Sequence, residues 1–161
     1  MAAVNVYKDI AKEDIALAIK SILETKYVTA LVGLFKQNGV NWDNFDNQEI
    51  AWADIAAGEA DYKGYASKII NPGNLVPGAN GRTNRYAQLS LNFPYDATKN
   101  GPDSNTLSHF AVGVDNGVTG LKVWYVGALP AVVTVANDGD TVAFKVSFAD
   151  FNALLANAIQ S

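Results

Sequence analysis

The only histidine of the chain, His109, follows Ser108, so a hydroxyl nucleophile and an imidazole base are neighbours in the sequence. Acyl transfer by a serine requires an imidazole that reaches both the hydroxyl and a carboxylate. The surrounding segment TLSHFAVGV has the composition of a β-strand, in which consecutive side chains point to opposite faces. We therefore expect His109 to be a half-buried sheet residue, and we predict no catalytic residues.

Metal ligands are scarce in this sequence. A zinc site takes three or four His, Cys or carboxylate ligands, whereas this chain has one histidine and no cysteine. Acidic side chains cluster at Asp43, Asp46 and Glu49, and again at Asp138 and Asp140. Neither cluster has the spacing of a calcium-binding loop, and such clusters are common in polar turns. We predict no metal site and no cofactor.

Three large aromatic residues, Trp42, Phe45 and Trp52, lie in or beside a hydrophilic loop. Exposed aromatic side chains often anchor a protein interface or stack on sugars. Alternatively, the three side chains fold back and cap the end of the domain. The sequence leaves both interpretations open, so these residues are the candidate partner interface.

The composition indicates a folded domain. Hydrophobic residues make up 49% of the 161 residues and charged residues 17%, the opposite of a disordered chain. The net charge is −4, and Arg82 and Arg85 lie in a polar turn rather than in a basic patch, so we expect no nucleic-acid binding. The absence of cysteine favours assembly in a reducing cytoplasm. We find no signal-peptide pattern and no apolar run of ~18 residues, and we expect no membrane partner.

Hydrophobic periodicity predicts helices near both ends of the chain and strands between them. An amphipathic helix is expected over residues 12–24, a short helical turn over 50–58, and a last helix over 149–161. Strands are expected over residues 26–37, 61–70, 85–93, 106–114, 121–129, 131–136 and 141–148.

Short strands at this spacing are typical of antiparallel sandwiches. We therefore predict a mainly β fold, an antiparallel β-sandwich or jelly-roll-like domain over residues 1–161. It would consist of an N-terminal helical segment (1–25), a β core (26–148) and a C-terminal helix (149–161).

The turn residues predict how the last strands connect. Asn116-Gly117 and Asp138-Gly139 predict tight hairpins, which need positive φ at both central residues. Pro130 predicts a corner between two strands. Within the strand LKVWYVGAL, Trp124 and Tyr125 are expected to point to opposite faces.

Three segments carry a family resemblance: LVGLFKQN, ADIAAGEADYKGYAS and LKVWYVGALPAVVTVANDGDTVAF. In this order and spacing they resemble small virion proteins of tailed bacteriophages, which include head decoration (cement) proteins and tail-associated accessory proteins. The resemblance covers residues 30–148.

The resemblance implies a non-enzymatic β-sandwich that clamps the major capsid protein from outside the shell, commonly as a homotrimer. Its location would be the virion, assembled in the host bacterial cytoplasm. A protein that binds only the assembled shell stabilises it by mass action, which requires no catalytic residues. The alternative is a tail-fibre or receptor-binding module that holds host glycans on its loop aromatics. A glycan hydrolase is the third hypothesis, although no acid–base pair can be named.

Overall fold

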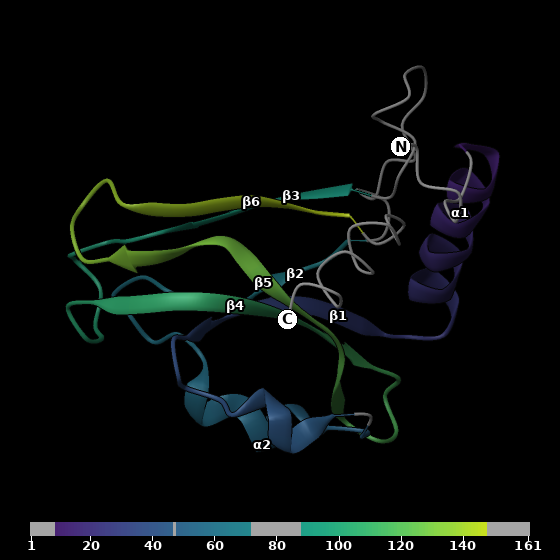
Figure 1. The fold of residues 1–161 in the computed structure, drawn as a ribbon, viewed down its shortest axis with the longest axis horizontal. Helices are drawn as coiled ribbons and strands as arrows, with labels where there is room; N and C mark the ends of the chain where they lie inside the picture. The colour runs from purple at the N-terminus through teal and green to yellow at the C-terminus, as the bar shows by residue number, and fades with distance from the viewer. Residues whose placement is uncertain (1–8, 47, 72–87, 148–161) are drawn as a thin grey trace, which may run out of the picture. The chain divides into compact units, whose positions relative to one another are not determined.

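The structure, a computed structural model, describes residues 9–46, 48–71 and 88–147. This part of the chain is mainly β, with antiparallel sheets, as the sequence predicts (Figure 1). The helix predicted over residues 149–161 lies outside the described residues.

The chain divides into two compact units. The larger unit consists of Lys26–Ile70 and Leu91–Phe144, and the smaller of Met1–Thr25, Asn71–Ser90 and Lys145–Ser161. One domain over the whole chain remains a prediction. In the smaller unit, the expected N-terminal helix is confirmed as α1 (Asp9–Thr25), where Lys20 and Glu24 form an ion pair of 3.8 Å one turn apart.

Four antiparallel strands form the main sheet of the larger unit, in the order β2-β1-β4-β5. Their bounds are Lys68–Ile69 for β2, Thr29–Lys36 for β1, Asn105–Asp115 for β4 and Leu121–Val135 for β5. The inner strands β1 and β4 are rich in apolar residues and carry buried side chains on both faces, which explains their central places.

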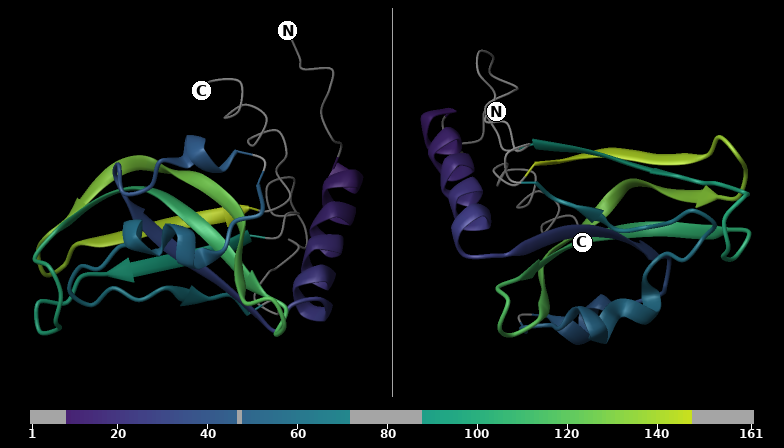
Figure 2. Two further views of the ribbon diagram at one scale, coloured as in Figure 1. Left: turned by 90° about the horizontal axis from the view of Figure 1, so that it is seen from below. Right: turned by 180° about the vertical axis from the view of Figure 1, so that it is seen from behind.

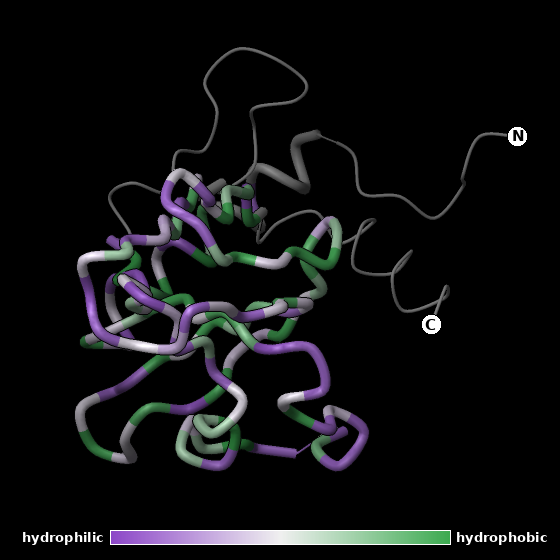
Figure 3. Tube along the Cα trace, turned by 90° about the vertical axis from the view of Figure 1, so that its left-hand side faces the viewer, coloured by the Kyte–Doolittle hydropathy of each residue, from purple (hydrophilic) through white to green (hydrophobic). Residues whose placement is uncertain are grey.

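A second sheet pairs β3 (Gln88–Pro94) with β6 (Thr141–Ser147). Leu91 and Phe93 of β3 are buried while Ser90 and Asn92 are exposed, so the predicted alternation is confirmed from Ser90 to Phe93; residues 85–87 of the predicted strand lie outside the described residues. Hydrophilic and hydrophobic stretches alternate along the chain (Figure 3).

Each face of the four-stranded sheet is covered (Figure 1, Figure 2). One face packs on a helical segment made of η1 (Trp42–Phe45), α2 (Trp52–Ile55) and η2 (Ala56–Gly58). The helical turn expected over 50–58 is thereby confirmed. On the other face, the ring of Phe110 in β4 lies 5.1 Å from that of Phe144 in β6, which connects the two sheets.

The corner predicted at Pro130 is wrong, because β5 continues through it. The β4–β5 register pairs His109 with Ala128 and Leu107 with Val133, so residues 129–132 lie opposite Ser108 alone. Proline is tolerated in this bulge because a bulged residue need not donate a backbone hydrogen bond to the neighbouring strand. Six strands therefore occur within the described residues where the sequence predicted seven.

Both predicted tight hairpins are also wrong. Strands β4 and β5 are joined by the loop 116–120, in which Gly117 has a positive φ but Asn116 does not. The Asn116 side chain instead accepts hydrogen bonds from the backbone N–H groups of Val118 and Thr119, both at 2.9 Å. Around Asp138 there is no hairpin, because β5 and β6 belong to different sheets.

The strand predicted over 61–70 shrinks to the two residues of β2. The segment before β2 turns at Gly64, whose φ is +83°, and it is held by Asn105 at the start of β4. The side-chain Oδ1 of Asn105 accepts from the backbone N–H groups of Asp61 and Tyr62, at 2.8 and 3.1 Å. The Asn105 side chain thus accepts the backbone hydrogen bonds that a neighbouring strand would accept if residues 61 and 62 were in a sheet, as the sequence pattern predicted.

The predicted alternation of Trp124 and Tyr125 is broken by a second bulge. Tyr125 pairs with Val112 and Val123 pairs with Gly113, so the register of the two strands shifts by one residue at Trp124. Val123 and Val126 consequently pack on the same apolar cluster although three positions separate them. The strand register predicted from strict alternation is therefore wrong at this point.

A buried tyrosine makes the stability of the fold sensitive to alkaline pH. The hydroxyl of Tyr62 donates to the carbonyl of Phe93 at 3.0 Å, and burial raises the pKa of Tyr62 to about 12, above the ~10 of an exposed tyrosine. The unfolded chain loses this proton more readily, so the contribution is complete below about pH 10 and is lost as the pH rises toward about 12.

We expect the free energy of unfolding, measured by denaturant titration, to fall over this interval. The substitution Tyr62→Phe should reduce the fall, because phenylalanine has no hydroxyl to titrate. An equal fall in wild type and Tyr62→Phe would contradict the prediction.

Candidate functional site

Trp52 lies beneath the main sheet, where the indole packs on two glycines of neighbouring strands. The side chain is 8% exposed. A Cβ atom at Gly33 of β1 would lie 2.8 Å from the indole, and one at Gly113 of β4 would lie 2.7 Å from it. Only glycine therefore leaves room for the ring at these two positions.

Trp42 and Phe45 are half-buried and pack against the apolar cluster that includes Trp52. The Trp42 ring lies 5.4 Å from that of Phe35 and 5.8 Å from the imidazole of His109. The structure thus brings all three predicted aromatic residues to one face of the main sheet. Only Trp42 and Phe45 keep a substantial part of their side chains at the surface.

A partly buried carboxylate completes this face. Glu59 accepts a hydrogen bond from Trp52 Nε1 at 3.0 Å and one from the Tyr65 hydroxyl at 2.7 Å. The same hydroxyl accepts from the backbone N–H of Leu34 at 3.0 Å. Burial and the Glu59 carboxylate raise the pKa of Tyr65, which stays protonated as the donor. This satisfied network holds the helical segment on the strands.

Beside Trp42 the surface is hollowed, and we call this feature the Trp42 hollow. Its volume is about 490 Å³. The residues that line it are Gln37, Asn38, Val40, Asn41, Trp42, Asp43, Ser108, His109 and Val132. They come from the loop after β1, from η1 and from the bulged level of β4 and β5.

Ser108 and His109 meet in this hollow, contrary to the expectation that they point to opposite faces. Their Oγ and Nδ1 atoms lie 2.7 Å apart. The bulge explains the contact, since β1 pairs Phe35 with His109 and Lys36 with Leu107 and so skips Ser108 as β5 does. Proline inside an apolar strand pattern was the one sequence signal for this irregularity.

Among the described residues, the Ser108–His109 pair has no third member of a catalytic triad. Within the part of the chain that the structure describes, no carboxylate is hydrogen-bonded to His109. Burial lowers the pKa of His109, so the imidazole is neutral at pH 7. The pair offers hydrogen-bonding groups to a ligand, but the geometry for acyl transfer is incomplete.

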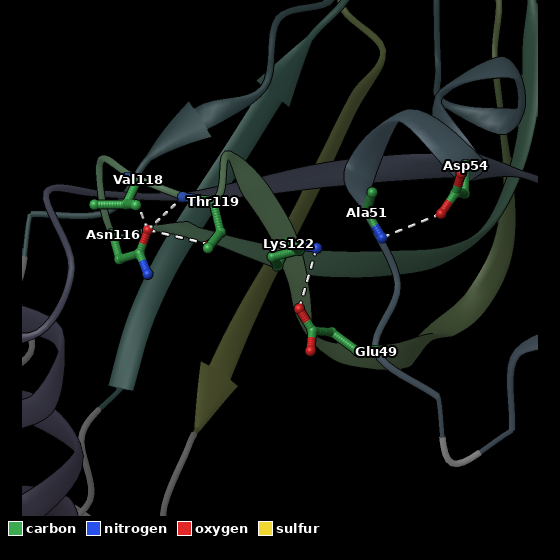
Figure 4. A network of polar contacts seen from close by, with 7 residues as sticks. All are labelled: Glu49, Ala51, Asp54, Asn116, Val118, Thr119 and Lys122. Atoms are coloured by element: carbon green, nitrogen blue, oxygen red, sulfur yellow. Dashed lines mark hydrogen bonds and ion pairs between the residues drawn. The ribbon is translucent and has the colours of Figure 1, made fainter.

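A second hollow lies at the end of the β4–β5 hairpin, and we call it the hairpin hollow. Its volume is about 280 Å³. The residues that line it are Lys26, Tyr27, Glu49, Val114, Asn116, Thr119, Lys122, Val123 and Trp124. Figure 4 shows the ion pair of Glu49 and Lys122, 3.1 Å long, beside the loop that Asn116 organises.

Backbone contacts join the residues after Glu49 to β5. The carbonyl of Ile50 accepts from the N–H of Val123 at 2.8 Å, and Ala51 forms a β-bridge with Lys122. Two exposed apolar residues are next to lining residues in the sequence: Val28, 72% exposed, follows Tyr27, and Val118, 86% exposed, precedes Thr119. A Cβ atom on the adjacent Gly117 would lie 3.5 Å from Val28, so Val28 lies against this loop.

Three members of the acidic clusters, Glu49, Asp138 and Asp140, have structural partners. Glu49 pairs with Lys122, and Asp138 accepts from the N–H of Ala97 at 2.8 Å. Asp140 accepts from two backbone N–H groups of its turn, which lowers its pKa. Among the residues described here, no three His, Asp or Glu side chains are grouped as metal ligands.

No protein-family model, curated protein sequence or solved structure matches the chain. No helix within the described ranges is both long and apolar enough to cross a membrane.

Proposed function

We propose that this chain is a non-enzymatic virion structural protein of tailed bacteriophages, a decoration or cement protein of the head. In this proposal the two sheets form one β-sandwich, and the protein binds the major capsid protein on the outside of the shell. The proposal is supported by one observation above all, the exposed apolar surface at the hairpin hollow.

The hairpin end has the composition of a protein interface. Val28 and Val118 expose most of their surface to water, and Tyr27 and Trp124 line the hollow beside them. Interfaces are enriched in aromatic residues, and clustered exposed apolar side chains on a folded surface favour a partner that covers them. A homotrimer at local three-fold positions would bind the lattice with avidity, since several hairpin ends engage at once.

Shell binding is tested by placing a charge at this end. We expect Val118→Asp to weaken binding of the purified protein to decoration-free shells by tenfold or more, because a carboxylate would be buried against apolar surface. Binding is measured by co-sedimentation with the shells. The matched control is Ile69→Asp, in which an equally exposed residue of β2 (76%) receives the same charge and binding should persist.

Two outcomes would reject the proposal. The first is that shells with and without the protein survive heating and osmotic shock equally well. The second is that Val118→Asp binds shells as tightly as Ile69→Asp does. Circular dichroism of both variants establishes that they remain folded.

A tail-fibre or receptor-binding module is the second candidate, and the Trp42 hollow is the observation that favours it. Antibody labelling of intact virions separates the two candidates, because label on heads supports decoration and label on tails supports receptor binding.

A further inference from the structure

The Trp42 hollow has no role in shell binding as proposed above, since no residue lines both hollows. Its volume of about 490 Å³ falls in the range of small-ligand sites. The pairing of β1, β4 and β5 is irregular beside this hollow, because the strand registers skip Ser108 and residues 129–132. Bulges of this kind commonly re-aim side chains beside binding sites.

The lining combines one aromatic ring with many neutral hydrogen-bonding groups. Part of the Trp42 indole packs on Phe35, and the side chain also lines the hollow. Around it, Gln37, Asn38 and Asn41 provide amides that both donate and accept hydrogen bonds. Asn38 adopts a left-handed backbone conformation (φ +59°), which asparagine tolerates better than most residues other than glycine.

Both nucleotide bases and sugar rings can stack on tryptophan, and the charge of the residues that line the hollow favours sugars. None of the described residues that line the hollow is a lysine or an arginine. Asp43 contributes a carboxylate, and His109 is neutral at pH 7 because burial lowers its pKa. A nucleotide would bring phosphate charges that require cations. A sugar ring brings instead an apolar C–H face for the indole and hydroxyl groups for the amides and carboxylate.

From this arrangement we propose that the Trp42 hollow binds an uncharged carbohydrate, with Trp42 stacking on one sugar ring and Asn41 and Asp43 binding its hydroxyl groups. Among the described residues, Asp43 is the only carboxylate that lines the hollow, whereas glycoside hydrolysis canonically uses two, so the proposal is for binding of the sugar and not for its cleavage. The inference does not depend on where on the virion the protein lies.

The test is binding of the full-length protein to a glycan array that carries neutral hexose and N-acetylhexosamine oligosaccharides beside sialylated and sulfated ones. We expect binding to neutral glycans only, followed by calorimetry with the best of them. Trp42→Ala should weaken this binding by tenfold or more. Trp124→Ala, which removes a half-buried tryptophan that lines the other hollow, should leave it unchanged.

A second variant protects the test against a folding defect in Trp42→Ala. Asn41 is exposed and its side chain forms no helix cap, so Asn41→Ala should keep the fold while it weakens binding severalfold. Three results would overturn the proposal: no neutral glycan bound by the wild type, binding restricted to the charged glycans, or undiminished affinity in both Trp42→Ala and Asn41→Ala.

Discussion

The substitution Trp52→Ala is expected to lower the free energy of unfolding by about 3–5 kcal/mol, the cost typical of removing a buried tryptophan. The indole fills the space against Gly33 and Gly113, which have no side chain to replace it. Its loss also removes the N–H that donates to Glu59. The resulting cavity cannot collapse easily, because two strands form its roof.

Denaturant unfolding monitored by circular dichroism measures this loss of free energy of unfolding, and two further variants serve as comparisons. Trp52→Phe keeps a ring but lacks the donor, so we expect an intermediate loss. Trp42→Ala removes a half-buried indole and should cost only about 1–2 kcal/mol. A loss in Trp52→Ala no greater than in Trp42→Ala would mean that the helical segment is not packed on the sheet as described.

The substitution Asn105→Leu is expected to destabilise the protein by about 2–5 kcal/mol, although leucine is apolar and similar in size. Asn105 is 7% exposed. Its Oδ1 accepts from Asp61 and Tyr62, and its Nδ2 donates to the carbonyl of Ser104 at 2.7 Å. Leucine would leave these three backbone groups without their partner, and each buried unpaired group costs about 1–3 kcal/mol.

An exposed asparagine provides the matched control for this experiment. Asn92 accepts a hydrogen bond from the hydroxyl of Thr141, but water can replace it. We therefore expect Asn92→Leu to change stability by less than about 1 kcal/mol. Equal losses in Asn92→Leu and Asn105→Leu would contradict the role assigned to Asn105, because burial would then make no difference.

The candidate site could be predicted only in part. The contrast between a hydrophilic loop and its large aromatic residues pointed to Trp42, Phe45 and Trp52, which do share one face of the sheet. No local pattern indicated that Trp52 would be buried, because the space for it comes from Gly33 and Gly113, far from it in the sequence. The contact of Ser108 with His109 was missed for a similar reason, since it arises where neighbouring strands fall out of register.

The sequence by itself determined the β-rich class, the N-terminal helix, the helical turn before Gly58 and the alternation in β3. These features depend on residues within a few positions of one another, where propensity and periodicity act. Only the tertiary structure decided that β5 continues through Pro130, that β6 pairs with β3 and that two bulges interrupt the main sheet. Strand pairing and register depend on which distant segments bury each other's apolar faces. A local sequence pattern does not indicate which segments these are.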